Sequence, residues 1–139
     1  MLKWLKRLCT PSAKYSESEE VPMTPDPHAQ RGLYVVRGYG RTCELASEVI
    51  SVNAIEDLIN RIDWQSGVHQ VICTVRPGVS MEVGGALNGE EGLRAMYCNR
   101  REKIECVITE PPKNPAEMIE ILVSFATSTE LWHEKYSFE

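Results

Sequence analysis

The stretch HQVICTVRPGVSMEVGG (residues 69–85) decides the fold. Its two halves are β-rich runs with alternating side-chain character, which is typical of strands in a sheet. Arg76, Pro77 and Gly78 separate the halves, and proline followed by glycine favours a tight turn. The stretch therefore predicts an antiparallel hairpin of strands 69–75 and 79–85.

Further strand patterns lie on both sides of this hairpin. Residues 32–40 and 42–50 form one pair of β-rich runs, and residues 93–98 and 103–109 form another around a charged connection. The short connections favour an antiparallel meander. The last run, LWHEKYSF (131–138), is predicted to close the chain as a terminal strand.

Two segments have helical patterns. Apolar residues recur at helical spacing in 52–63, and Ser51 can cap the helix that they predict. Asn114 and Pro115 supply a cap and a first-turn proline for a second helix, whose broad apolar stripe runs to residue 126. The expected fold class is α+β: an antiparallel meander sheet with two helices packed on one face, in the order ββαββββαβ.

The chain divides into a tail and one domain. Residues 1–30 are expected to be a basic N-terminal tail and a linker rich in Pro, Ser and Glu, followed by a single α+β domain over 31–139. The tail sequence MLKWLKRLC predicts a short basic amphipathic helix. A weak membrane contact and a frayed tail are both open, and the frayed tail is favoured. The residues of the membrane alternative are Lys3, Trp4, Lys6 and Arg7.

Charge and composition restrict the partner. No apolar run approaches the roughly 20 residues that a bilayer span requires, so a soluble protein is expected. The net charge is −5, but residues 1–14 hold four cations and no acid, which leaves −9 on the rest of the chain. An acidic body argues against nucleic acid as a partner and favours a basic protein.

The cysteines and histidines predict no chemistry. Five cysteines without CxxC spacing favour neither a disulfide framework nor a zinc site, so a reducing, cytoplasmic location without metal or cofactor is expected. His28 falls in the expected linker, and alternation places His69 roughly 13 Å from Cys73. GGALNGEEG (84–92) lacks the GK[ST] of a phosphate loop and is interpreted as a turn. We therefore expect no catalytic residues and no enzyme.

Residues 51–138 resemble the small immunity proteins of bacterial polymorphic toxin systems, particularly the first-named family, which is often paired with deaminase toxins. That family is described as α+β with a characteristic C-terminal tryptophan, which Trp132 matches here, although HEKYSFE continues beyond it. The segments that carry the resemblance are ISVNAIEDLINRID (50–63), VICTV (71–75), MEVGG (81–85), GGALNGEEGL (84–93), KIECVIT (103–109) and PPKNPAEMIEILVSFATSTELW (111–132).

The resemblance implies a protein that binds a cognate toxin and occludes its active site or substrate channel, as a monomer or homodimer without chemistry of its own. An acidic body suits a toxin whose active-site surface is basic. Two alternatives stay open: an adaptor or binding module docked at the inner membrane surface by its basic tail, and a small enzyme. Trp132 could also be core rather than contact. The candidate contacts are Glu82, Glu90, Glu91, Glu130, Trp132 and Glu134.

Overall fold

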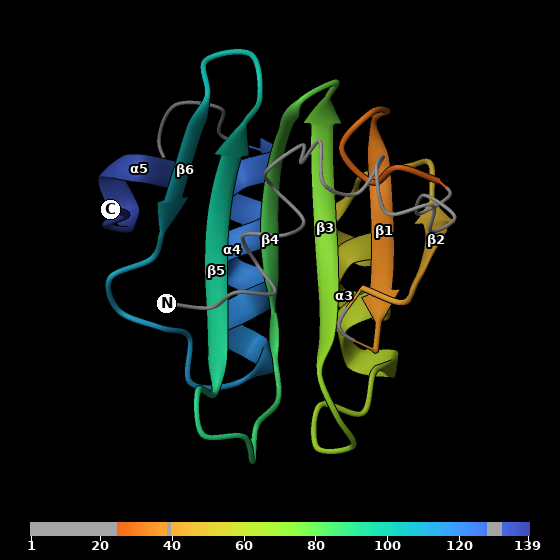
Figure 1. Cartoon of the computed structure of the whole chain (residues 1–139), viewed down its shortest axis with the longest axis vertical. Helices are drawn as coiled ribbons and strands as arrows, with labels where there is room; N and C mark the ends of the chain where they lie inside the picture. The colour runs from red at the N-terminus through yellow and green to blue at the C-terminus, as the bar shows by residue number, and fades with distance from the viewer. Residues whose placement is uncertain (1–24, 39, 128–131) are drawn as a thin grey trace.

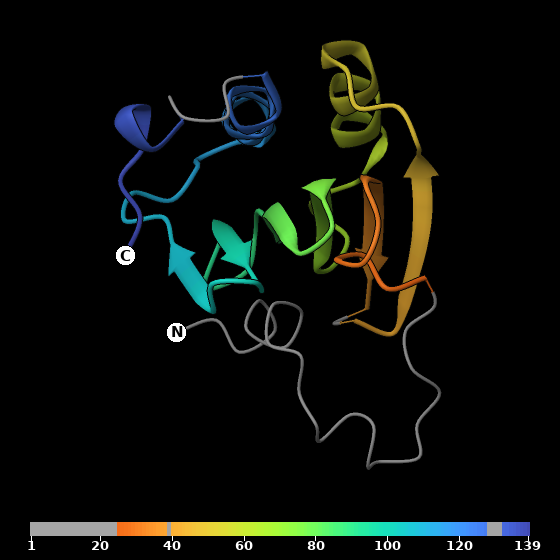
Figure 2. The ribbon, with the colours of Figure 1, turned by 90° about the horizontal axis from the view of Figure 1, so that it is seen from above.

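The computed structural model describes residues 25–38, 40–127 and 132–139. They form a six-stranded antiparallel sheet in the order β2-β1-β3-β4-β5-β6 (Figure 1). Helices α3 and α4 lie on the same side of the sheet, as Figure 2 shows from above. The α+β class is confirmed, as is the predicted order of elements through α4, and the C-terminal segment adds a single bridge to the sheet. The elements are β1 (Gly32–Arg37), β2 (Thr42–Ser47), α3 (Val52–Arg61), β3 (His69–Arg76), β4 (Val79–Gly85), β5 (Leu93–Asn99), β6 (Ile104–Val107), α4 (Pro115–Thr127) and α5 (Trp132–Lys135).

The predicted β3–β4 hairpin sits in the middle of the sheet. Cys73 lies opposite Met81 across the hairpin, and both are fully buried on the side that faces the helices. The turn uses Gly78 at a φ of 84°, a left-handed conformation that glycine adopts without strain. The turn residues that the sequence predicted are therefore the ones that set the register of the central strands.

The two long helices begin where their caps predicted. The Ser51 hydroxyl accepts a hydrogen bond from the Ala54 N–H at 3.1 Å, and the Asn114 side-chain oxygen accepts one from Glu117 N–H at 2.9 Å. Helix α3 ends at Arg61, two residues before the expected end. The buried Trp64 indole N–H donates to the Ile59 carbonyl at 3.0 Å, which turns the chain back under the helix.

The terminal strand predicted over 131–138 is mostly replaced by a helical turn. Residue 131 lies outside the described residues, and 132–135 form α5, closed by a hydrogen bond from Tyr136 N–H to the Trp132 carbonyl at 2.9 Å. Only Phe138 pairs in β fashion, as an isolated bridge with Ile108. The helical turn lets the Trp132 ring reach the core while the last residues still run along the edge of the sheet near β6.

The folded part includes residues that the sequence assigned to the linker. Pro27 accepts a hydrogen bond from the Thr74 hydroxyl, the His28 carbonyl accepts one from Gly78 N–H at 2.8 Å, and Tyr34 donates to the Gln30 carbonyl at 2.9 Å. The segment 25–30 thus packs against the sheet, ahead of the start expected near Arg31. No helix within the described residues is long and apolar enough to cross a membrane.

Candidate functional site

Exposed apolar side chains gather at one edge of the molecule. Among the described residues, four large hydrophobic side chains are exposed, and three of them fall between residues 45 and 52. Leu45 is 42% exposed, Val49 is 66% exposed and Val52 is 42% exposed. We call this stretch of β2, the following loop and the first turn of α3 the β2–α3 surface. Leu45 lies opposite Tyr34, on the face of β2 away from the helices, whereas Val49 and Val52 lead into α3. Exposed apolar groups on both faces of one sheet edge are suited to contact with a partner that covers the edge.

Strand β2 leaves its outer backbone edge available. It pairs only with β1 among the described strands, and Leu45 lies over Gly32, where a Cβ atom would come within 2.8 Å of the leucine side chain. Glycine at position 32 therefore lets the β2 edge lie close to β1. An edge strand with unpaired N–H and C=O groups can add a further strand from another chain.

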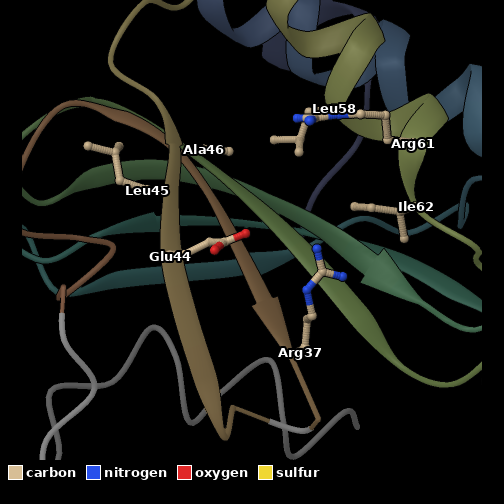
Figure 3. Close-up of a pocket in the computed structure, with 7 residues that line it drawn as sticks. All are labelled: Arg37, Glu44, Leu45, Ala46, Leu58, Arg61 and Ile62. Carbon is tan, nitrogen blue, oxygen red and sulfur yellow. The ribbon is translucent and has the colours of Figure 1, made fainter.

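A charged groove lies on the helix side of the same edge (Figure 3). It has a volume of about 350 Å³ between β1, β2 and α3. Arg37 and Arg61 reach it from β1 and α3, Glu44 reaches it from β2, and Leu58 and Ile62 supply apolar wall. The groove therefore offers two guanidinium groups and one carboxylate beside an apolar wall, a combination suited to peptide side chains and backbone carbonyls.

Exposed carboxylates lie on the same elements as these apolar residues. Glu44, Glu48, Glu56 and Asp57 are all exposed on β2, the loop after it and α3. Apolar groups gain from losing water on contact, and nearby acidic groups favour the encounter with a basic protein.

A second, buried cluster lies on the face of the sheet that the helices do not cover. His28 Nδ1 lies 3.0 Å from the Ser80 hydroxyl, and His28 Nε2 lies 3.2 Å from a Glu82 carboxylate oxygen. All three side chains are 1% exposed or less. Serine, histidine and a carboxylate are the residue types of hydrolase triads, so this arrangement is a candidate for chemistry.

The burial of this cluster argues for anchoring rather than catalysis. Ser80 is 0% exposed, so a substrate carbonyl has no path to the hydroxyl in this conformation. The contacts instead fasten the segment 25–31 to β4. Asp26 contributes by accepting a hydrogen bond from His28 N–H at 2.9 Å and pairing with Arg100 at 3.2 Å. Although burial acts to raise it, the pKa of the Asp26 carboxyl is lowered by these partners.

Among the described residues, the buried thiols of Cys43 and Cys73 are poor nucleophiles, and no metal site is found. Burial raises the pKa of the Cys73 thiol to about 12, and burial together with Asp26 and Glu44 raises that of Cys43 to about 12. Thiols with such pKa values hold almost no thiolate at neutral pH. No group of three or more His, Cys, Asp or Glu side chains in this part of the chain could hold a metal ion.

The structure does not bring the six predicted contact residues together. Glu90 and Glu91 are exposed in the β4–β5 loop, and Glu134 is exposed on α5, toward the other end of the sheet in Figure 1. Glu82 is 0% exposed, so it offers no surface for contact. Glu130 lies outside the described residues, as do Lys3, Trp4, Lys6 and Arg7.

Trp132 is also interior, which selects the core alternative. Its ring centroid lies 4.7 Å from Tyr97, 5.7 Å from Phe125 and 5.2 Å from Phe138, and the residue is 6% exposed. These contacts have the edge-to-face and tilted geometries of packed aromatic rings. The tryptophan therefore closes the core between α4, β5 and the C-terminus.

Two parts of the site were missed by the sequence reasoning. His28 was assigned to a linker, although Ser80 and Glu82 alternate with Met81 in the strand predicted over 79–85, and such polar side chains need a partner when both faces of the strand are covered. The β2–α3 surface had a weaker signal, the apolar Val49 and Val52 on either side of a helix cap.

Comparisons with protein-family models, curated proteins and solved structures find no match.

Proposed function

We propose that this chain is an immunity protein that binds a cognate bacterial toxin and neutralises it by covering the toxin's active site or substrate channel. The observation that carries the proposal is the β2–α3 surface, where Val49 and Val52 are exposed on the loop and helix start beside edge strand β2, and Leu45 is exposed on the other face of that strand. A solvent-facing group of this kind is stabilised when a partner covers it.

The charge of the chain favours a basic toxin as the partner. The carboxylates of Glu48, Glu56 and Asp57 flank the apolar residues, within a body that is acidic as a whole. Opposite charges raise the rate of encounter and discriminate against wrong partners. Toxins that act on nucleic acids present basic channels to their substrates, and covering such a channel would block them.

The pattern of residues 51–138 supports the same proposal through its resemblance to immunity proteins of polymorphic toxin systems. The interior placement of Ser80, Cys43 and Cys73 fits a protein that acts by binding. The β2 edge, which pairs only with β1 among the described strands, gives the toxin a backbone to pair with, and the groove beside it can receive a side chain from the paired segment.

The test is co-expression with the toxin encoded beside this gene, scored by survival and by co-purification. We expect rescue of growth and a stable complex, and the absence of both would overturn the proposed function.

The position of the surface is tested with Val49→Arg, which puts a cation at the most exposed apolar position and should weaken toxin binding at least tenfold. The matched control is Leu87→Arg, because Leu87 is the fourth exposed large hydrophobic side chain and lies in the β4–β5 loop, 36% exposed. A complex that tolerates Val49→Arg and fails with Leu87→Arg would move the docking surface to the other loop and leave the immunity function standing.

A further inference from the structure

A group of cations lies at one end of the sheet, whereas the molecule as a whole is acidic. The β3–β4 and β5–β6 turns meet the entry segment 26–31 there, and we call this region the turn end (Figure 1). Four of its five cations are exposed, Arg100 being half-buried. Its carboxylates are Asp26 and Glu102, and its cations are Arg31, Arg76, Arg100, Arg101 and Lys103.

Hydrogen bonds hold these cations in place. Arg100 N–H donates to the Gly78 carbonyl and Gly78 N–H donates to the His28 carbonyl, each at 2.8 Å, so the two turns and the entry segment form one unit. The Arg31 guanidinium donates to the Val75 carbonyl at 2.8 Å. Arg100 pairs with Asp26 at 3.2 Å, which accounts for one of the two carboxylates. Within the turn end, the remaining exposed cations face solvent beside one acid, Glu102, and the exposed Glu48 follows β2 at the same end of the sheet.

The difference in charge between the turn end and the rest of the domain favours one orientation of the domain near a negatively charged surface. Outside the turn end, residues 25–139 contain fifteen acids and six bases. A negatively charged plane therefore attracts the turn end and repels most of the rest of the domain, which favours an approach with the turn end foremost. A long polyanion that wraps around the domain would meet mainly repulsion.

The chain also enters the folded domain at this end. Residues 1–14 carry Lys3, Lys6, Arg7 and Lys14 together with apolar Leu2, Trp4, Leu5 and Leu8, a composition suited to the surface of an anionic bilayer. The stretch from Lys14 to Pro25 can reach at most about 40 Å even when fully extended. A tail bound to a membrane would therefore keep the turn end close to the same surface.

We propose that the turn end is a docking surface for the anionic lipid headgroups of a bilayer, which it contacts together with the basic N-terminal tail. The tail's apolar residues favour a lipid surface over a nucleic acid, because they gain nothing from phosphates in water and gain from burial at the acyl boundary. Each cation near such a surface strengthens binding about fivefold. The inference does not depend on the toxin.

The experiment measures partition of the full chain onto vesicles of phosphatidylcholine alone or mixed with phosphatidylglycerol, by flotation at low and high salt. The test variant replaces Arg76, Arg101 and Lys103 with glutamine. The matched control replaces Arg41, Lys113 and Lys135, three exposed cations elsewhere, and has the same net charge. We expect the test variant to lose about a hundredfold in binding to the mixed vesicles and the control to lose much less.

Further measurements separate the contribution of the turn end from that of the tail, and binding to lipid from binding to nucleic acid. Deletion of residues 1–14 should weaken vesicle binding and leave the difference between test and control variants in place. Equal binding by the two triple variants, with or without the tail, would overturn the proposal. Tighter binding to duplex DNA than to the mixed vesicles at the same salt would overturn the assignment to lipid. Wild-type binding that salt leaves unchanged would also contradict it, since headgroup attraction is screened.

Discussion

On the helix side of the sheet, Val71, Met81 and Val83 pack against α3 and α4, whereas the opposite side buries Ser80 and Glu82 equally deeply. Apolar side chains on the helix side gain from leaving water whatever their exact neighbours are. The polar groups on the opposite side are stable only when a particular atom meets them, because an unmet buried polar group is costly. The helix side is thus held by the extent of apolar contact. The opposite side combines a smaller apolar cluster, Tyr34, Val36, Cys43 and Ile72, with polar groups that depend on specific partners.

The largest effect is expected on the helix side, from Trp132→Ala. Removal of the indole leaves Tyr97 and Phe125 facing a cavity, which should lower the free energy of unfolding by about 3–5 kcal/mol. Urea denaturation measures the change, with Glu134→Ala on the same helical turn as an exposed control that should change it little. A small effect of Trp132→Ala combined with loss of toxin binding would return this residue to the contact surface.

The opposite face is tested by His28→Ala and Glu82→Gln in a double-mutant cycle. Loss of His28 removes a partner of a buried carboxylate, so we expect a cost of about 3 kcal/mol. The coupling energy between the two changes should be about 1–3 kcal/mol. Chemical denaturation of the four proteins gives both values, and His133→Ala serves as the exposed histidine control. Additive effects would show that the two side chains do not depend on each other.

Gly84→Ala tests how closely the central strands approach on this same face. A Cβ atom at position 84 would collide with the His69 carbonyl oxygen and come within 2.9 Å of Gln70 Cα, and neither backbone atom can move away cheaply. We expect a loss of about 1–3 kcal/mol in the free energy of unfolding. At Gly89 the nearest atom to a Cβ is Ala86 Cβ at 3.4 Å, so Gly89→Ala should be nearly neutral. Equal stability of the two variants would contradict the close approach.

The smallest effect concerns Asp26, which joins the entry segment to Arg100. Because the folded-state pKa of Asp26 is below its ordinary value of 3.8, the ionised form contributes stability above that value, and this contribution is lost as pH falls through the folded-state pKa. Asp26→Asn should lower the free energy of unfolding at pH 7 by less than about 1 kcal/mol, since the side chain is 46% exposed and solvent screens the pair. Thermal unfolding at pH 7 and near pH 3 should show the difference shrinking in acid. A stability difference between wild type and Asp26→Asn that grows as the pH falls would contradict the lowered pKa of Asp26.

Local patterns predicted the helices, the hairpins and the helix-side core, because caps, turns and apolar periodicity act over a few residues. Ser51, Asn114 and Gly78 each do what their neighbours in sequence implied. The same reasoning failed at residues 132–135, where burial of Trp132 against Tyr97 outweighs strand propensity. It also failed at His28, whose partners lie more than fifty positions away.

The sequence by itself determined the α+β class, the order of the elements and the acidic character of the chain, all of which depend on side-chain type and spacing. Only the tertiary structure decided that Glu82 and Trp132 are interior, that residues 25–31 are anchored to the sheet, and that Leu45, Val49 and Val52 stay in water. It also gathered the cations of two separate turns at one end. These outcomes depend on contacts between segments that are far apart in the sequence. Packing of the whole chain determines those contacts, and local propensity does not.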